Sequence, residues 1–97
     1  MNNLVEKHFE LCEKLNKIYE QKNKAYGNSF GETFEKLGLI SAVTRISDKY
    51  NRLVNLATNQ DIDKGDEAIE DTLLDLSNYC LMTYMELKKG KYTNEQF

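Results

Sequence analysis

The stretch from Asp66 to Leu87 repeats apolar residues at the spacing of an α-helix, and this pattern constrains the fold more than any other feature of the chain. One stripe along it comprises Ile69, Leu73, Leu76, Cys80, Tyr84 and Leu87. Residues three or four positions apart lie on one side of a helix, so the stripe predicts a long amphipathic helix. We expect the apolar side of this helix to face the core of the protein.

Two earlier stretches have the same periodicity, and the chain contains no proline. They predict helices from about residue 3 to 24 and from about residue 35 or 36 to 57. The segment between them, Ala25–Phe34, carries two glycines and three aromatic residues and is expected to be an irregular loop. The predicted fold class is therefore all-α, with one domain over residues 1–97 built as an antiparallel bundle of three helices.

The 97 residues carry a formal net charge of −3, which does not favour binding to DNA or RNA. The amino terminus lacks the pattern of a signal peptide, and no apolar run approaches the length that crosses a membrane. We therefore expect a cytoplasmic protein, in a bacterial cell or a phage-infected host cell, without a membrane partner. Because a chain this short buries a modest core, a homo-oligomer is also expected.

Charges of opposite sign are separated along the chain. From Lys36 to Thr58, four basic residues stand against one acidic residue. From Asn59 to Tyr79, one basic residue stands against seven acidic residues. If the helices formed by these two segments pack together, they create a site that carries both signs of charge.

Three carboxylates of the last predicted helix are spaced four residues apart, at Glu67, Asp71 and Asp75. They form a carboxylate ladder on one helical face, where each pair of like charges costs about 0.2–0.5 kcal/mol. A bound cation would turn this repulsion into binding energy, and Asp48 on the preceding helix is a fourth candidate metal ligand. The alternatives are that a solvated surface tolerates the repulsion, or that arginines of the preceding helix pair with the ladder.

Basic and aromatic residues indicate where a nucleotide would bind. Arginine has a planar fork that matches a phosphate group, and an aromatic ring can stack on a base. The predicted nucleotide-binding residues are Tyr26, Ser29, Phe30, Arg45, Lys49, Arg52 and Asn78. The competing interpretation is structural: the aromatic residues would plug the end of the bundle, and the basic residues would form salt bridges within or between helices.

Most of these residues fall in three blocks of sequence. The blocks read Tyr26-Gly-Asn-Ser-Phe30, Arg45-Ile-Ser-Asp-Lys-Tyr-Asn-Arg-Leu53 and Asp66-Glu-Ala-Ile-Glu-Asp-Thr-Leu-Leu-Asp-Leu-Ser-Asn-Tyr79. In order and spacing they resemble the nucleotide-modification-associated family of phages and bacteria, over most of the chain from Tyr26 to Leu87. The resemblance implies a protein that handles nucleotides.

The third block also resembles the second metal motif of the MazG-type all-α nucleoside triphosphate pyrophosphatases, which hold Mg²⁺ with carboxylates from two helices. This similarity implies magnesium as cofactor and cleavage of an NTP or dNTP to the monophosphate and pyrophosphate. Carried over to this chain, the metal ligands would be Asp48, Glu67, Asp71 and Asp75. The chain departs from that pattern, because its earlier helix offers one acidic residue in place of Glu-x-x-Glu and its ladder has steps of four residues.

Three functions stay open on these grounds. As an enzyme, the protein would hydrolyse a nucleotide with Mg²⁺. As a binding protein without a metal, it would hold a nucleotide unchanged, and in a phage it would sequester a cyclic nucleotide that serves as an immune signal. As a scaffold or interaction module, it would use its charged residues only to pair helices with one another.

Overall fold

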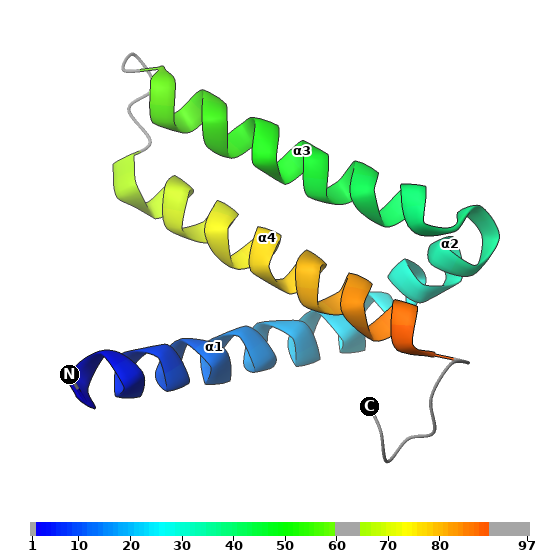
Figure 1. Cartoon of the computed structure of the whole chain (residues 1–97), viewed down its shortest axis with the longest axis horizontal. Helices are drawn as coiled ribbons and strands as arrows, with labels where there is room; N and C mark the ends of the chain where they lie inside the picture. The colour runs from blue at the N-terminus through cyan, green and yellow to red at the C-terminus, as the bar shows by residue number, and fades with distance from the viewer. Residues whose placement is uncertain (1, 60–64, 90–97) are drawn as a thin grey trace.

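The computed structural model describes residues 2–59 and 65–89 and contains four helices in them (Figure 1). They are α1 (Asn2–Tyr26), α2 (Ser29–Leu37), α3 (Leu39–Thr58) and α4 (Gly65–Lys88). The described residues contain no strand, so the predicted all-α class is confirmed. No helix among them is long and apolar enough to span a membrane.

Four helices replace the three that the sequence predicted, because most of the expected loop is helical. α2 begins inside that segment and continues beyond its end to Leu37. Gly38 separates α2 from α3. Phe30, Phe34 and Leu37 follow one another at steps of four and three residues, which gives α2 an apolar side. The two glycines and the small polar residues of the segment concealed this short period.

Two glycines end one helix and allow the next to start in a new direction. Gly27 has φ of 67° and Gly38 has φ of 79°, a region that residues with a Cβ atom rarely adopt. The Gly27 N–H donates to the Asn23 carbonyl at 2.8 Å, and the Gly38 N–H donates to the Phe34 carbonyl at 2.7 Å. Each glycine thus closes the last turn of the preceding helix and redirects the chain.

The helices are arranged around α4 (Figure 1). α3 and α4 form an antiparallel hairpin, and α2 connects this hairpin to α1. α1 runs opposite to α3 and in the same direction as α4, and its N-terminal half diverges from α4. One contact between α1 and α4 is a hydrogen bond in which Asn78 Nδ2 donates to the Leu15 carbonyl at 3.1 Å.

The buried core of the described residues is small. Its side chains are those of Ala42, Thr72 and Thr83, and Gly31 is buried where α2 meets α4. The apolar stripe of α4 was expected to face the core, and this expectation is wrong for part of it. Leu73 is 45% exposed and Tyr84 is 57% exposed, because the partner helices of α4 contact other sides of it.

Candidate functional site

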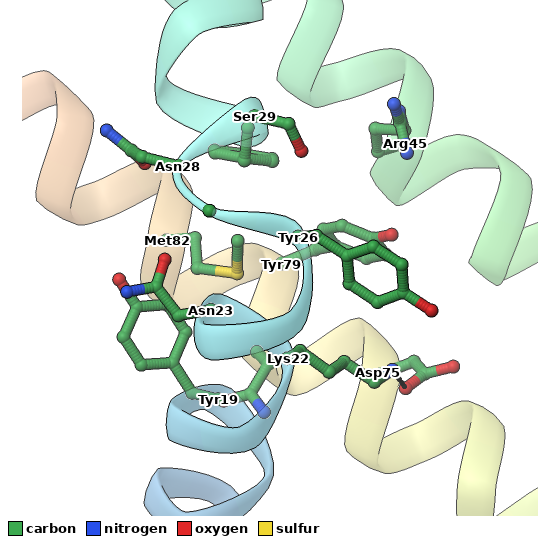
Figure 2. Close-up of a pocket in the computed structure, with 13 residues that line it drawn as sticks. Tyr19, Lys22, Asn23, Tyr26, Asn28, Ser29, Arg45, Asp75, Tyr79 and Met82 are labelled. Carbon is green, nitrogen blue, oxygen red and sulfur yellow. Dashed lines mark hydrogen bonds and ion pairs between the residues drawn. The ribbon is translucent and has the colours of Figure 1, made fainter.

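A cavity of about 370 Å³ lies where the C-terminal end of α1, the turn at Gly27, and the start of α2 meet α3 and α4 (Figure 2). Its volume falls in the range of small-molecule sites. Six of its lining residues are aromatic or cationic. The full lining is Tyr19, Lys22, Asn23, Tyr26, Gly27, Asn28, Ser29, Phe30, Arg45, Asp75, Asn78, Tyr79 and Met82.

Aromatic rings from three helices line this first cavity. Phe30 of α2 stacks on Tyr79 of α4, with ring centroids 5.9 Å apart and an interplanar angle of 28°. Tyr26, the last residue of α1, is 74% exposed and lines the same cavity as Tyr79. Because Gly27 turns the chain directly after Tyr26, the end of α1 and the start of α2 present their rings to one space.

Arg45 places a cation in the same cavity. It comes from α3, and in Figure 2 it lies across the cavity from the end of α1. Among residues 2–59 and 65–89, the guanidinium group of Arg45 forms no hydrogen bond or ion pair. An arginine without a protein partner at the edge of a cavity is available for an anion, and its fork suits a phosphate or a carboxylate.

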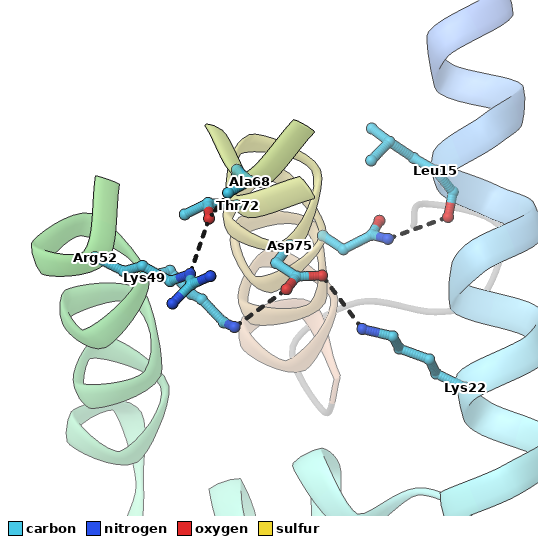
Figure 3. A network of polar contacts seen from close by, with 8 residues as sticks. Leu15, Lys22, Lys49, Arg52, Ala68, Thr72 and Asp75 are labelled. Carbon is cyan, nitrogen blue, oxygen red and sulfur yellow. Dashed lines mark hydrogen bonds and ion pairs between the residues drawn. The ribbon is translucent and has the colours of Figure 1, made fainter. Parts of the chain in front are cut away.

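Asp75 lies between two lysines and joins three helices (Figure 3). Lys22 Nζ of α1 is 3.2 Å from Asp75 Oδ1, and Lys49 Nζ of α3 is 3.1 Å from Asp75 Oδ2. The carboxylate is about a quarter exposed, at 27%. Lysine side chains from both neighbouring helices thus converge on one residue of α4.

The lysines also set the protonation of Asp75. Burial is the largest single influence and raises the pKa of the Asp75 carboxyl group. The hydrogen bonds and charges of Lys49 and Lys22 together outweigh burial and hold the pKa below its usual range. Asp75 is therefore a carboxylate at neutral pH.

A second cavity of about 380 Å³ lies between α3 and α4, further along the hairpin. It is lined by Lys49, Arg52, Glu67, Ala68, Asp71, Thr72 and Asp75. Arg52 Nε donates to Thr72 Oγ1 at 3.2 Å, and Thr72 Oγ1 donates to the Ala68 carbonyl at 2.7 Å (Figure 3). Asp75 lines both cavities, so the two spaces adjoin one another at the paired lysines.

The comparisons with known proteins give one finding. A family model described as nucleotide modification associated domain 1 matches residues 22–87. The chain belongs to this family. The matched segment contains every residue of the second cavity and all of the first cavity except Tyr19. No curated protein and no solved structure gives a significant match.

Within this family member, the predicted nucleotide-binding residues divide between the two cavities. Tyr26, Ser29, Phe30, Arg45 and Asn78 line the first cavity. Lys49 and Arg52 line the second. Residues from all three predicted sequence blocks therefore meet in one region of the fold.

The predicted metal ligands are less well grouped. The ladder residues Glu67, Asp71 and Asp75 line the second cavity, whereas Asp48 of α3 lines neither cavity. Among the side chains that the structure describes, no three Asp, Glu, His or Cys residues come close enough together to hold a metal ion. The alternative in which arginines of the preceding helix pair with the ladder does not hold at Asp75, which pairs with Lys22 and Lys49.

Several residues of the first cavity were not predicted from the sequence. Tyr19, Lys22 and Asn23 belong to the first predicted helix, in which no site residue was predicted, and Tyr79 was not among the predicted site residues. The three residues of α1 reach the cavity because the C-terminal half of α1 lies on α4, and no local pattern encodes that crossing. The clustering of Tyr19, Lys22, Asn23 and Tyr26 on one side of a helix was the available signal.

Proposed function

We propose that this protein binds a nucleotide in the first cavity. The base would stack on the aromatic wall formed by Tyr26, Phe30 and Tyr79, as bases do on aromatic platforms in other nucleic-acid-binding sites. The phosphates would lie toward Arg45 and toward the two lysines at Asp75. The setting that we propose is the cytoplasm of a bacterial cell or of a phage-infected host cell.

One observation carries this proposal. Aromatic rings and an arginine with no partner among the described residues line the same cavity, in a segment that matches a nucleotide-modification-associated family. A base needs a flat apolar surface, and a phosphate needs a fixed cation. The amide groups of Asn23 and Asn78 in the same lining supply the donors and acceptors that a base edge requires.

The second cavity gives the phosphate chain a direction in which to extend. A phosphate placed at Lys49 would compete with the carboxylate of Asp75 for the same ammonium group, 3.1 Å from Asp75 Oδ2. Next to Lys49 in this cavity, Arg52 donates a hydrogen bond from Nε to Thr72, and its two terminal amino groups can donate to another acceptor. A nucleotide with more than one phosphate would therefore find successive cations along the hairpin.

Hydrolysis of an NTP or dNTP to the monophosphate and pyrophosphate with Mg²⁺ is the second candidate function. The observation that favours it is the presence of the ladder residues Glu67, Asp71 and Asp75 beside Lys49 and Arg52 in one cavity. As they are placed, these carboxylates do not fit a magnesium site, because no three of them converge and Asp75 is held by two lysines. We therefore assign no step of the reaction to a metal.

An incubation experiment separates catalysis from binding. The purified protein is mixed with a panel of NTPs, dNTPs and cyclic nucleotides, with and without Mg²⁺, and free ligand, heat-released ligand and products are separated by anion-exchange chromatography. We expect a nucleotide to leave the free fraction and to return unchanged on heating. Monophosphate and pyrophosphate that accumulate with time, and that Asp71→Asn abolishes, would instead establish the enzyme.

One outcome of the same experiment would contradict the proposal that the first cavity binds a nucleotide. If every nucleotide stays free and intact at protein concentrations above those of the ligands, the first cavity is not a nucleotide site. Retention of a cyclic nucleotide in preference to the triphosphates would support the role in sequestering an immune signal, which requires no metal.

A further inference from the structure

We infer that two copies of this chain associate through the apolar side of the α3–α4 hairpin. Six large side chains define this apolar hairpin face, and each is between 39% and 57% exposed. They are Val43, Tyr50 and Val54 of α3 and Leu73, Tyr84 and Leu87 of α4.

Helix geometry places these residues on one side of the hairpin. Ala42 is buried, and Lys49, which lies about 20° around α3 from it, pairs with Asp75 of α4, so Ala42 marks the side of α3 that faces α4. At about 100° per residue, the three apolar residues of α3 lie roughly 80–120° around the helix from Ala42. Thr72 marks the facing side of α4, and the three apolar residues of α4 lie roughly 60–120° from it in the same sense. Because the two helices are antiparallel (Figure 1), these equal rotations lead to the same side.

Among the described residues of α3 and α4, charged side chains start outside the arc of these six residues, and Lys88 borders it, with its Nζ 5.4 Å from the centroid of the Tyr84 ring. The charged residues of α3 are Arg45, Asp48, Lys49 and Arg52, and they lie roughly 240–340° from Ala42 in the same sense. Those of α4 lie roughly 160–320° from Thr72. The hairpin therefore has a charged side, which holds both cavities, and an apolar side.

A second copy of the chain is the occupant that this surface fits. A face that is apolar at its centre, with Lys88 at one edge, gives a nucleic acid or a charged peptide little to pair with, whereas the same face of another copy is its own complement under two-fold symmetry. The single chain also buries little apolar surface: Ala42 is the one apolar side chain that is fully buried among the described residues. A hairpin with so small a core gains stability when a second hairpin covers it.

The dimensions agree with a stable interface. α3 has 20 residues and is therefore about 30 Å long. Two such helices packed at about 8–10 Å present a footprint of roughly 600 Å², and their accessible area is larger because side chains project from it. Specific interfaces bury about 800 Å² on each partner, so this whole side of the hairpin, with the apolar hairpin face at its centre, is of the size that a specific interface needs.

The inference is independent of the proposed nucleotide function, because the cavities lie on the other side of the hairpin. A two-fold dimer built on this face leaves both first cavities open to solvent on its outer surfaces. Loss of nucleotide binding would thus leave the dimer in place, and the failure of either proposal is visible separately.

The wild-type protein supplies the first test. Sedimentation velocity across the micromolar range should give the mass of a dimer, and the Tm should rise with protein concentration, because dimerisation stabilises the folded state by mass action. A monomer at every concentration, or a Tm that does not depend on concentration, would overturn the inference.

The two cysteines provide an internal comparison without any substitution. Cys80 of α4 lies roughly 80° around the helix from Thr72, inside the apolar hairpin face, and Cys12 lies on α1. Both thiols are free and exposed in the single chain. In the dimer, maleimide should modify Cys80 several-fold more slowly than Cys12. Equal rates at a concentration where the protein is a dimer would place the interface elsewhere.

Charge substitutions complete the test. Tyr84→Glu buries a carboxylate in the interface and should give a monomer or an unstable protein, whereas Tyr84→Phe should keep the dimer. Phe9→Glu is the matched control, because Phe9 is an aromatic residue of α1 that is 63% exposed. If Phe9→Glu gives a monomer and Tyr84→Glu stays a dimer, α1 carries the contact and the inference is wrong.

Discussion

The two sides of the α3–α4 hairpin differ in almost every property. On one side, Arg45, Lys49 and Arg52 and the ladder carboxylates line two adjoining cavities, and α1 covers part of that side. On the other, large apolar side chains such as Tyr50 and Tyr84 are 57% exposed, and no helix of the described part of the chain covers them. One pair of helices thus separates a ligand-binding side from an association side, and each can be altered without the other.

The largest expected effect comes from the cation in the first cavity. Arg45→Ala removes a charge-assisted contact to phosphate worth about 1.5–3 kcal/mol, so nucleotide affinity should fall roughly 10- to 100-fold. The mass in sedimentation should not change, because Arg45 is on the charged side. Isothermal titration calorimetry on the variant and the wild type measures the affinity, and Arg45→Lys should recover part of it. An unchanged affinity in Arg45→Ala would mean that Arg45 does not contact the nucleotide.

A smaller effect of opposite sign is expected at Asp75. Asp75→Asn removes a negative charge that occupies Lys22 and Lys49, so the affinity for a phosphate-bearing nucleotide should rise several-fold. The same change should lower the free energy of unfolding at pH 7 by about 1 kcal/mol, since it removes two partly exposed ion pairs. If Asp75 served as a ligand of an essential cation, affinity would fall instead, and the titration distinguishes the two cases.

The pH dependence follows from the pKa of Asp75. Its pKa is lower in the folded protein than its ordinary value of 3.8. The ion pairs therefore add their stability above that value, and this stability is lost as the pH falls through the folded pKa. The difference in unfolding free energy between wild type and Asp75→Asn, measured with urea, should be present at pH 7 and should shrink as the pH falls below 3.8, until it is gone at a pH under the folded pKa. A difference that persisted there would have another cause.

The smallest effect is expected at Asp71, the next residue of the carboxylate ladder. Among the residues that the structure describes, Asp71 forms no ion pair. Asp71→Asn relieves repulsion at a spacing of four residues and should change the free energy of unfolding by no more than about 0.5 kcal/mol, in the stabilising direction. Urea unfolding measures this change. A clear loss of stability would mean that the ladder pairs with basic groups as a structural element.

The sequence predicted the long helices well and the connections between them poorly. The periodicity of apolar residues located α1, α3 and α4 to within a few residues, because amphipathic helices repeat their pattern over many turns. α2 was missed, since Phe30, Phe34 and Leu37 define only two turns and Gly31 interrupts them. The exposed side of α4 was assigned to the core for the same local reason: periodicity shows that a side is apolar but not what covers it.

The site was predicted in its parts and not in its assembly. Five of the predicted nucleotide residues line the first cavity, because each was chosen for chemistry that its own helix or turn displays. The lysine pair at Asp75 could not be predicted, since Lys22 and Lys49 come from helices that meet only in three dimensions. The assignment of Asp48, Glu67, Asp71 and Asp75 as metal ligands stays a prediction. Asp48 lies outside both cavities, and the ammonium groups of Lys22 and Lys49 stand at Asp75 where a metal ion would bind.

Chemical-shift mapping tests the separation of the two sides most directly. Titration of ¹⁵N-labelled protein with a triphosphate or a cyclic nucleotide should shift the amide signals of Tyr26, Phe30, Arg45 and Tyr79, which surround the first cavity. The signals of Val54 and Leu73, on the apolar hairpin face, should not move. Shifts confined to the apolar hairpin face, or no shifts at all with every nucleotide of the panel, would contradict the assignment of the charged side as the nucleotide site.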